Sequence, residues 1–187
     1  MKERIKELLG DQPIIPAIKN DDGLKAVLEA DGQIVFVLYG NVLNIGEIVR
    51  KLKESGKIVF VNVDLIEGFA SKEIVVEYLK KNSEADGILS NKAAMIRAAK
   101  ALGLLAIHRY FVVDSFSYEN LEKQLEIAQP DFLEVLPGWP RMISWVVEKV
   151  KIPVIAGGLV CTKEDVVAAL GAGATSICST NQDVWSL

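Results

Sequence analysis

One pattern recurs along the whole chain and constrains its fold more than any other feature. A short apolar run rich in Val, Ile and Phe is followed by a polar or glycine-containing break, and then by a stretch whose apolar residues lie three and four apart. The runs contain little polar alternation, which is typical of parallel strands buried on both faces. The eight predicted strands are residues 14–18, 34–39, 58–63, 87–90, 104–108, 132–136, 153–156 and 176–179.

Eight strands that alternate with helices predict a closed (β/α)8 barrel of the TIM type, in the α/β class. An open doubly wound sheet is the main competitor, but it more often has about five or six strands. The chain has 187 residues, whereas this barrel usually takes about 250, so we expect short helices and few insertions. No linker or change of composition divides the chain, which predicts a single domain over residues 1–187.

The two ends of the chain depart from the repeating pattern. Residues 2–9 carry Ile5, Leu8 and Leu9 on one helical face, so we expect an extra helix that closes the bottom of the barrel, a frayed tail being the alternative. Only seven residues, 181–187, follow the last predicted strand. The eighth helix should therefore be truncated.

Composition excludes several classes of protein. Lys and Arg number 21 against 25 Asp and Glu, and the net charge of −4 argues against a polycation that coats nucleic acid, although a local basic patch remains open. Cys161 and Cys178 are too few for a disulfide framework, and with His108 as the only histidine we expect no metal site. The apolar runs are shorter than the roughly 20 residues that span a bilayer, and residues 1–10 lack a signal-peptide core. We therefore expect a cytoplasmic protein without membrane segments.

In a barrel, the loops after the carboxyl ends of the strands build the binding face. Gly157 and Gly158 end the seventh predicted strand, and Ser179 and Thr180 end the eighth. Adjacent glycines let backbone N–H groups approach a ligand, and barrels commonly hold phosphate at these two loops. We predict an anion site there, the alternative being that the glycines only permit a tight turn.

Four charged residues at the strand ends are further candidates for ligand binding. Asp64 shares a strand face with Phe60 and Asn62 and should point to the barrel mouth, where it either accepts ligand hydroxyls or pairs with Arg109 or Lys19. Glu134 lies in mid-strand and should take a ligand hydroxyl or pair with the same two cations. Arg109 could hold a phosphate bidentately.

No spacing among these groups is a signature of catalysis. An enzyme needs an acid–base pair or a nucleophile, and Lys19, Asp64, His108 and Glu134 are available without forming a recognisable motif. We therefore expect no catalytic residues and no cofactor. An aldolase or isomerase that acts on a small phosphorylated metabolite is the alternative.

Six blocks of the sequence together form a recognisable pattern. They are residues 13–20 (PIIPAIKN), 63–68 (VDLIEG), 87–90 (GILS), 109–115 (RYFVVDS), 130–138 (PDFLEVLPG) and 156–159 (AGGL), followed by Thr162. The first, second and fifth blocks are the most specific, in their order and spacing. With these blocks the chain resembles, over nearly its whole length, the glycerol-3-phosphate-responsive antiterminators of bacterial glycerol operons.

The resemblance implies a regulator: a small barrel that senses glycerol 3-phosphate, or a similar small phosphate, and then acts on leader mRNA so that transcription passes a terminator. Two positions depart from the family pattern, namely Cys161, where a basic residue is usual, and His108, where an uncharged amide is expected. No RNA-binding motif marks the RNA surface. A homo-oligomer would double a small patch. The candidates for such a patch are three clusters on the predicted helices and the barrel rim, namely Lys51 and Lys53 with Lys57, Lys80 with Lys81, and Lys92 with Arg97 and Lys100.

Overall fold

The computed structural model describes residues 2–187 and confirms the closed barrel. Eight strands, all parallel, pair in chain order, and β8 returns to pair with β1. The strands are β1 (Ile14–Ile18), β2 (Ile34–Val37), β3 (Ile58–Asn62), β4 (Gly87–Ser90), β5 (Leu105–Phe111), β6 (Phe132–Leu136), β7 (Val154–Gly157) and β8 (Ser176–Ser179). The open-sheet alternative is therefore wrong.

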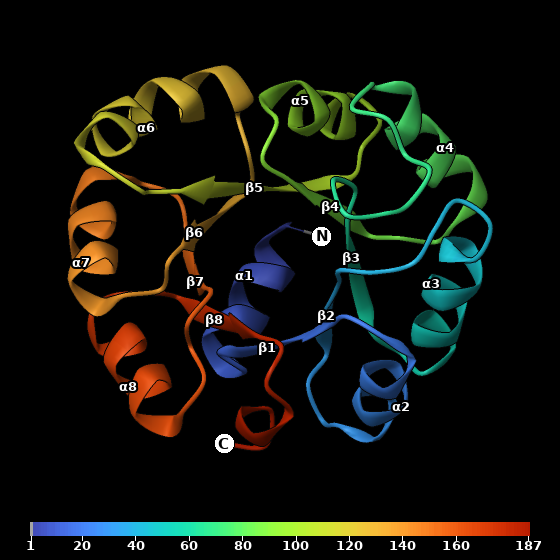
Figure 1. The fold of residues 1–187 in the computed structure, drawn as a ribbon, viewed down its shortest axis with the longest axis horizontal. Helices are drawn as coiled ribbons and strands as arrows, with labels where there is room; N and C mark the ends of the chain where they lie inside the picture. The colour runs from blue at the N-terminus through green and yellow to red at the C-terminus, as the bar shows by residue number, and fades with distance from the viewer. Residues whose placement is uncertain (1) are drawn as a thin grey trace.

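Helices surround this barrel on the outside (Figure 1). They are α2 (Asp21–Glu29), α3 (Ile45–Glu54), α4 (Ile74–Asn82), α5 (Ala93–Ala101), α6 (Ser115–Ala128), α7 (Pro140–Lys149) and α8 (Lys163–Gly171). The last unit ends in a single turn of 3-10 helix, η1 (Gln182–Val184), which confirms the predicted truncation. Trp185, next to this turn, packs against both of the apolar clusters that lie between the strands and the helices. Its indole N–H donates to the carbonyl of Ser179 at 2.9 Å.

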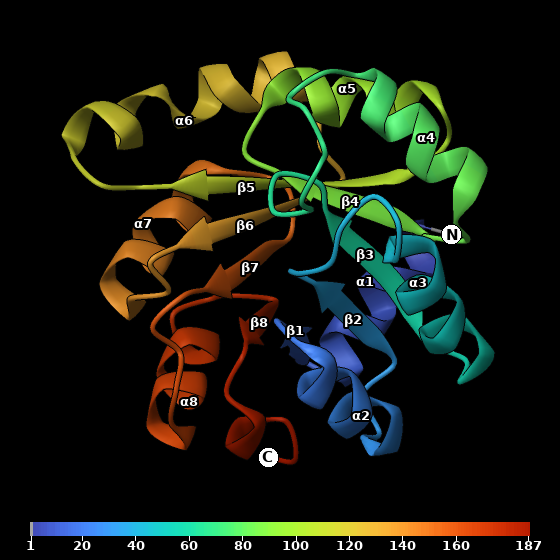
Figure 2. The same cartoon turned by 45° about the vertical axis from the view of Figure 1, so that its right-hand side comes forward.

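The extra N-terminal helix, α1 (Lys2–Asp11), lies inside the ring of strands, as Figures 1 and 2 show. Ile5 and Leu9 are each only 1% exposed and pack in the cluster that contains Phe36, Phe60 and Phe132 from the barrel interior. Because α1 leads directly into the amino-terminal end of β1, it closes the barrel at that end. The predicted plug is confirmed, and the opposite end, where the strands finish, stays available for a site.

Side-chain parity along the strands separates the interior from the helical layer. On β3, Val59 and Val61 pack with the surrounding helices, whereas Ile58 and Phe60 point into the barrel. The same alternation places Asn62 on the interior face, whereas Asp64 lies in the turn after β3, where the alternation no longer applies.

One strand is longer than the sequence indicated. We expected the fifth strand to end at His108, but β5 continues to Phe111. Its extension pairs in register with β6, from Arg109 opposite Glu134 to Phe111 opposite Leu136. The polar residues that suggested a strand end are therefore part of the barrel wall. No helix among residues 2–187 is long and apolar enough to cross a membrane.

Candidate functional site

A cavity of about 210 Å³ opens at the carboxyl ends of the strands. It is smaller than the roughly 300–1,000 Å³ of pockets for drug-sized ligands, so its size suits a small metabolite. Five of the predicted site residues line it, namely Arg109, Glu134, Gly158, Ser179 and Thr180. The other lining residues are Ala17, Leu38, Leu159, Val160, Cys161 and Cys178.

An ion pair between neighbouring strands forms one wall of this cavity. The Nε of Arg109 lies 3.1 Å from Oε2 of Glu134, and the two side chains are 20% and 4% exposed. The ion pair that the sequence offered as one alternative for Glu134 is thus present. The two atoms are not aligned for a hydrogen bond, and both are buried without a hydrogen-bond partner among the described residues. A buried polar atom without a partner costs free energy, so these two atoms favour a polar ligand or water that hydrogen-bonds to them.

Burial also shifts the titration of the groups around the ion pair. Desolvation raises the pKa of Glu134, and the nearby Arg109 charge and Cys178 thiol only partly oppose this effect. Desolvation and the Glu134 charge raise the pKa of the Cys178 thiol well above its ordinary value. Cys178 therefore stays an uncharged thiol, so it is not an activated nucleophile.

The two adjacent glycines have different roles. A Cβ on Gly157 would lie 2.6 Å from Oε1 of Glu134, so this glycine makes room for the buried carboxyl group and does not line the cavity. Gly158 does line the cavity and has φ +70°, in the left-handed region that favours glycine. The next residue, Leu159, also has a positive φ, 59°, which is uncommon for a residue with a side chain.

The loops after β7 and β8 are tied together by side chains. The Ser179 hydroxyl donates to the carbonyl of Val160 at 2.7 Å and accepts from the N–H of Asn181 at 3.1 Å. The Asn181 side-chain amide donates to the carbonyl of Cys161 at 2.8 Å. Ser179 therefore positions the loops, and its hydroxyl is already occupied.

Hydrogen-bond donors remain free on these loops. Within residues 2–187, the backbone N–H groups of Gly158, Leu159 and Thr180 make no hydrogen bond, and neither does the exposed Thr180 hydroxyl. All three residues line the cavity. Free N–H groups and a guanidinium around one small cavity form a setting that suits an anion.

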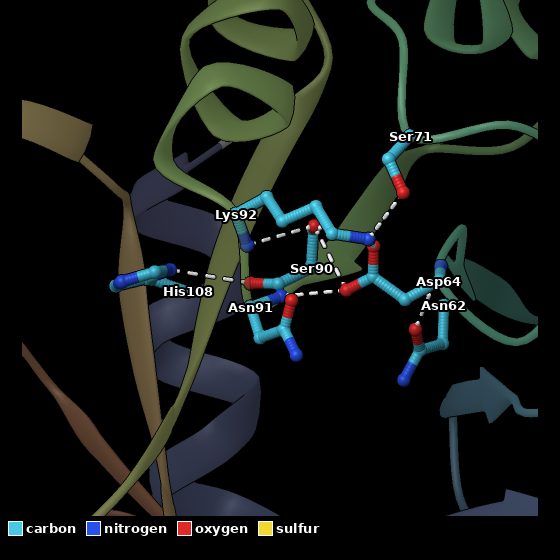
Figure 3. Close-up of polar contacts among 7 residues, drawn as sticks. All are labelled: Asn62, Asp64, Ser71, Ser90, Asn91, Lys92 and His108. Atoms are coloured by element: carbon cyan, nitrogen blue, oxygen red, sulfur yellow. Dashed lines mark hydrogen bonds and ion pairs between the residues drawn. The ribbon is translucent and has the colours of Figure 1, made fainter.

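The structure does not bring Lys19 or Asp64 into the cavity. Lys19 is exposed and outside the lining, and neither Arg109 nor Lys19 is the partner of Asp64. Asp64 pairs instead with Lys92, at 3.2 Å, because β4 and its following loop lie beside β3 (Figure 3). This corrects the two pairings that we expected from the sequence.

Asp64 is the centre of a polar cluster that is already saturated (Figure 3). Its carboxylate accepts from the Ser90 hydroxyl at 2.9 and 3.0 Å and from the N–H of Asn91 at 2.7 Å, besides the ammonium of Lys92. Lys92 also donates to the hydroxyl of Ser71 at 2.6 Å. These contacts hold the loops after β3 and β4 together, so Asp64 is held as a structural group.

His108, whose role the sequence left open, lies on the helix-facing side of β5. It is 1% exposed, and its Nδ1–H donates to the carbonyl of Ser90 at 3.2 Å, while Nε2 is buried without a partner among the described residues. Burial lowers the pKa of His108 and keeps the ring neutral. It does not line the cavity. Within residues 2–187, no group of three or more His, Cys, Asp or Glu side chains is placed to hold a metal ion.

The sequence reasoning missed apolar and sulfur-containing residues of the lining. Ala17 and Leu38 follow the interior parity of β1 and β2, so strand alternation could have identified them. Cys178 was interpreted as a core residue, and it is buried at 6% exposure, but it also faces the cavity. Leu159 gives no signal in the sequence, because its place depends on the left-handed backbone of its loop.

Known proteins resemble this chain over nearly its whole length. YgcP, an uncharacterised protein of Escherichia coli, is 46% identical over 181 residues, which are 96% of this chain and 95% of that protein. A glycerol uptake operon antiterminator regulatory protein from Listeria monocytogenes has a crystal structure with a TM-score of 0.89, 33% identity, and coverage of 94% and 95% of the two chains. A glycerol uptake operon antiterminator-related protein from Thermotoga maritima gives a TM-score of 0.82 at 31% identity, over 93% and 98% of the chains.

A family model, described as glycerol-3-phosphate responsive antiterminator, matches residues 14–185. This range includes all eight strands and the cavity at their carboxyl ends. The chain therefore belongs to the glycerol-3-phosphate responsive antiterminator family.

Proposed function

We propose that this protein binds glycerol 3-phosphate in the cavity at the barrel mouth and, in that state, binds the leader RNA of glycerol-utilisation genes as a transcription antiterminator. The observation that carries the proposal is the ion pair of Arg109 and Glu134, buried at the cavity with its hydrogen-bonding capacity unfilled. Family membership supplies the class of regulator.

The cavity offers one set of groups for each end of this effector. The phosphate fits the loops after β7 and β8, where the free N–H groups of Gly158, Leu159 and Thr180 adjoin the guanidinium of Arg109. The glycerol hydroxyls fit Glu134, whose Oε2 lacks a partner. A ligand that joins an anion to hydroxyl groups uses both sets, whereas glycerol or inorganic phosphate uses one.

Thermal denaturation tests the effector. A ligand that binds only the native state at 100 times its Kd stabilises it by about 2.7 kcal/mol, and in a chain of this size each kcal/mol raises Tm by about 2–4 °C. Glycerol 3-phosphate should therefore raise Tm by roughly 5–10 °C. Glycerol and inorganic phosphate, each at the same concentration, should give much smaller shifts.

Glu134→Gln is the informative variant, because it keeps the size of the side chain and removes its charge. It should lose most of the shift that is specific to glycerol 3-phosphate, while the small shift with inorganic phosphate persists. Glu164→Gln, on the exposed first turn of α8, is the matched control and should behave like the parent. A Glu134→Gln protein that responds to glycerol 3-phosphate as strongly as the parent would place the effector elsewhere.

The enzyme alternative predicts a different result for the same proteins. An aldolase or isomerase would turn over a phosphorylated triose or sugar, and that activity would disappear with changes at Glu134, Lys19 or Asp64. Binding of glycerol 3-phosphate without turnover of such substrates is what a sensor requires. Assays of the purified parent with both types of ligand separate the two functions.

A further inference from the structure

Exposed phenylalanine and tryptophan side chains gather in one sector of the molecule, beside the mouth of the barrel. Every phenylalanine and tryptophan that is exposed within residues 2–187 belongs to β5, to α6 or to the start and outer face of α7. They are Phe111, Phe116, Trp139 and Trp145, with exposed fractions of 44%, 74%, 57% and 42%. We call these four residues the aromatic strip. Large apolar groups that stay in water next to a cavity commonly mark an interaction surface.

Hydrogen bonds between neighbouring elements hold this strip together. The N–H of Val112, next to Phe111, donates to the carbonyl of Leu136 at the end of β6, three residues before Trp139. Phe116 lies in the first turn of α6, and Trp139 immediately precedes α7. These two helices are neighbours around the barrel (Figure 1). The Tyr118 hydroxyl of α6 donates to the carbonyl of Trp145 in α7 at 3.2 Å. The elements that carry the four rings are therefore neighbours at this side of the barrel.

Cations accompany the exposed rings. The guanidinium of Arg109 lies 5.4 Å from the ring centre of Phe111, and that of Arg141 lies 4.9 Å from the ring centre of Trp145. The third cation–π contact among the described residues places Lys149 of α7 over the ring of Tyr118 in α6. Aromatic faces next to arginines suit the bases and phosphates of a single-stranded nucleic acid, since bases stack on the rings and phosphates meet the guanidinium groups.

Most lysines of the clusters that the sequence offered as RNA contacts are less available than Arg141, although Lys80 and Lys81 are exposed and make no ion pair among the described residues. Lys53 pairs with Asp86 at 2.7 Å, Lys100 pairs with Asp131 at 2.6 Å, and Lys92 is held by Asp64. Lys57, from the same clusters, is buried and donates to backbone carbonyls. These charges stabilise the barrel, so they attract a polyanion weakly.

Charge also limits how far the strip can extend. The groove between the carboxyl-terminal ends of α6 and α7 has a volume of about 520 Å³, and its charged lining residues are Glu122, Glu126, Lys149 and Lys151. The two carboxylates balance the two ammonium groups, so this groove offers phosphates no net attraction. A nucleic acid would therefore lie along the half of this sector nearest the barrel mouth.

From these contacts we infer that single-stranded RNA binds along the aromatic strip, with bases stacked on Phe116 and Trp139 and a phosphate at Arg141. The inference rests on the proposed function and gives it a route of coupling. Arg109 lines the effector cavity and also lies over Phe111 at the start of the strip. An effector phosphate that orders this guanidinium also fixes the first ring of the RNA surface, so effector and RNA should strengthen each other's binding.

The test compares exposed residues inside and outside the strip. Phe116→Ala, Trp139→Ala and Arg141→Gln are made in the full chain. The controls are Leu43→Ala, before α3, and Ile74→Ala, at the start of α4, since these residues are 92% and 61% exposed and belong to elements outside the strip. Each protein is titrated into fluorescently labelled leader transcript of a glycerol-utilisation operon, with saturating glycerol 3-phosphate. Glycerol 3-phosphate binding is measured in parallel by the shift in Tm.

Each aromatic variant should weaken RNA binding at least about five-fold, the loss expected for one stacked base. Arg141→Gln should also reduce the slope of log K against log salt concentration by about 0.7, the value for one phosphate contact on a single strand. All three variants should bind glycerol 3-phosphate like the parent, and the control variants should bind RNA like the parent.

Three outcomes would overturn the inference, and they are distinguishable. If the parent binds RNA and the strip variants bind equally well, the RNA surface lies elsewhere while the proposed function stands. If the parent binds no RNA at low salt, the RNA part of the proposed function fails as well. If Phe116→Ala or Trp139→Ala instead turns a dimeric parent into a monomer with RNA binding intact, the strip is a contact between two copies of the chain.

Discussion

Replacing Gly157 with alanine probes the packing on which the proposed effector site depends. The added Cβ would lie 2.6 Å from Oε1 of Glu134 and 3.1 Å from its Cγ and Cδ atoms. The Glu134 side chain is only 4% exposed and cannot swing into solvent without leaving Arg109. The carboxyl group must therefore move within a closed environment, away from the position that the cavity requires.

Overpacking of this kind typically costs about 1–3 kcal/mol, which in a chain of 187 residues corresponds to a fall in Tm of about 2–12 °C. The variant should also lose most of its Tm shift with glycerol 3-phosphate, because the ion pair is displaced. Urea denaturation monitored by circular dichroism gives the stability, and denaturation with and without ligand gives the binding.

Gly171→Ala is the matched control. It lies at the end of α8, and an added Cβ would meet nothing within 4 Å. Its stability should stay the same or rise by up to about 1 kcal/mol, with the ligand response unchanged. Glu134→Asp, with a side chain shorter by one methylene, should be less harmful in the Gly157→Ala background than in the parent. A Gly157→Ala protein with parental Tm and parental ligand response would refute the assignment of Gly157 as space for Glu134.

Two further predictions concern buried polar groups outside the cavity. Burial lowers the pKa of His108 in the native protein, so between its ordinary value of about 6.5 and its native value only the unfolded chain binds the proton. As the pH falls through this range, the free energy of unfolding should decrease by up to about 1.4 kcal/mol per pH unit. His108→Asn, which can still donate to Ser90, should show a shallower loss between pH 6.5 and 5 in urea titrations, and equal slopes would contradict this. Asp64→Asn should lower stability by about 1–3 kcal/mol through loss of its charged contacts, with the glycerol 3-phosphate shift retained. Loss of the shift in Tm with glycerol 3-phosphate would indicate that Asp64 contacts the ligand.

The barrel could be predicted from the sequence because the buried strands and helices each produce a regular spacing of apolar residues. Parallel strands covered on both faces read as short apolar runs, and within them alternate positions such as Val59 and Phe60 take opposite faces. The same parity placed Asn62 on the interior face of β3, and it placed Glu134 inside the barrel, where a charge needs a partner. The N-terminal plug could be predicted because Ile5 and Leu9 form an apolar helical face ahead of the first strand, and this face must be buried against the barrel.

The details of the site depend on register and loop geometry, which a single sequence does not record. Asp64 pairs with Lys92 because the loop after β4 brings that ammonium above β3, a contact between residues 28 positions apart. The extension of β5 depends on its pairing with β6 and not on the local apolar pattern, which ends at His108. Gly157 and Gly158 look alike in the sequence, yet one makes room for Glu134 and the other adopts a left-handed backbone conformation. Only the packed structure separates these two roles.

The central claim, that an effector at the barrel mouth controls RNA binding, is tested most directly by titrating the protein into leader RNA at several concentrations of glycerol 3-phosphate. RNA should bind more tightly with the effector, by a factor in the range of about 5–150 that is typical of such coupling, and RNA should tighten effector binding by the same factor. With a net charge of −4, binding should depend on a local surface and weaken as salt rises. Clear binding of glycerol 3-phosphate with equal RNA affinity in its presence and absence would contradict the account.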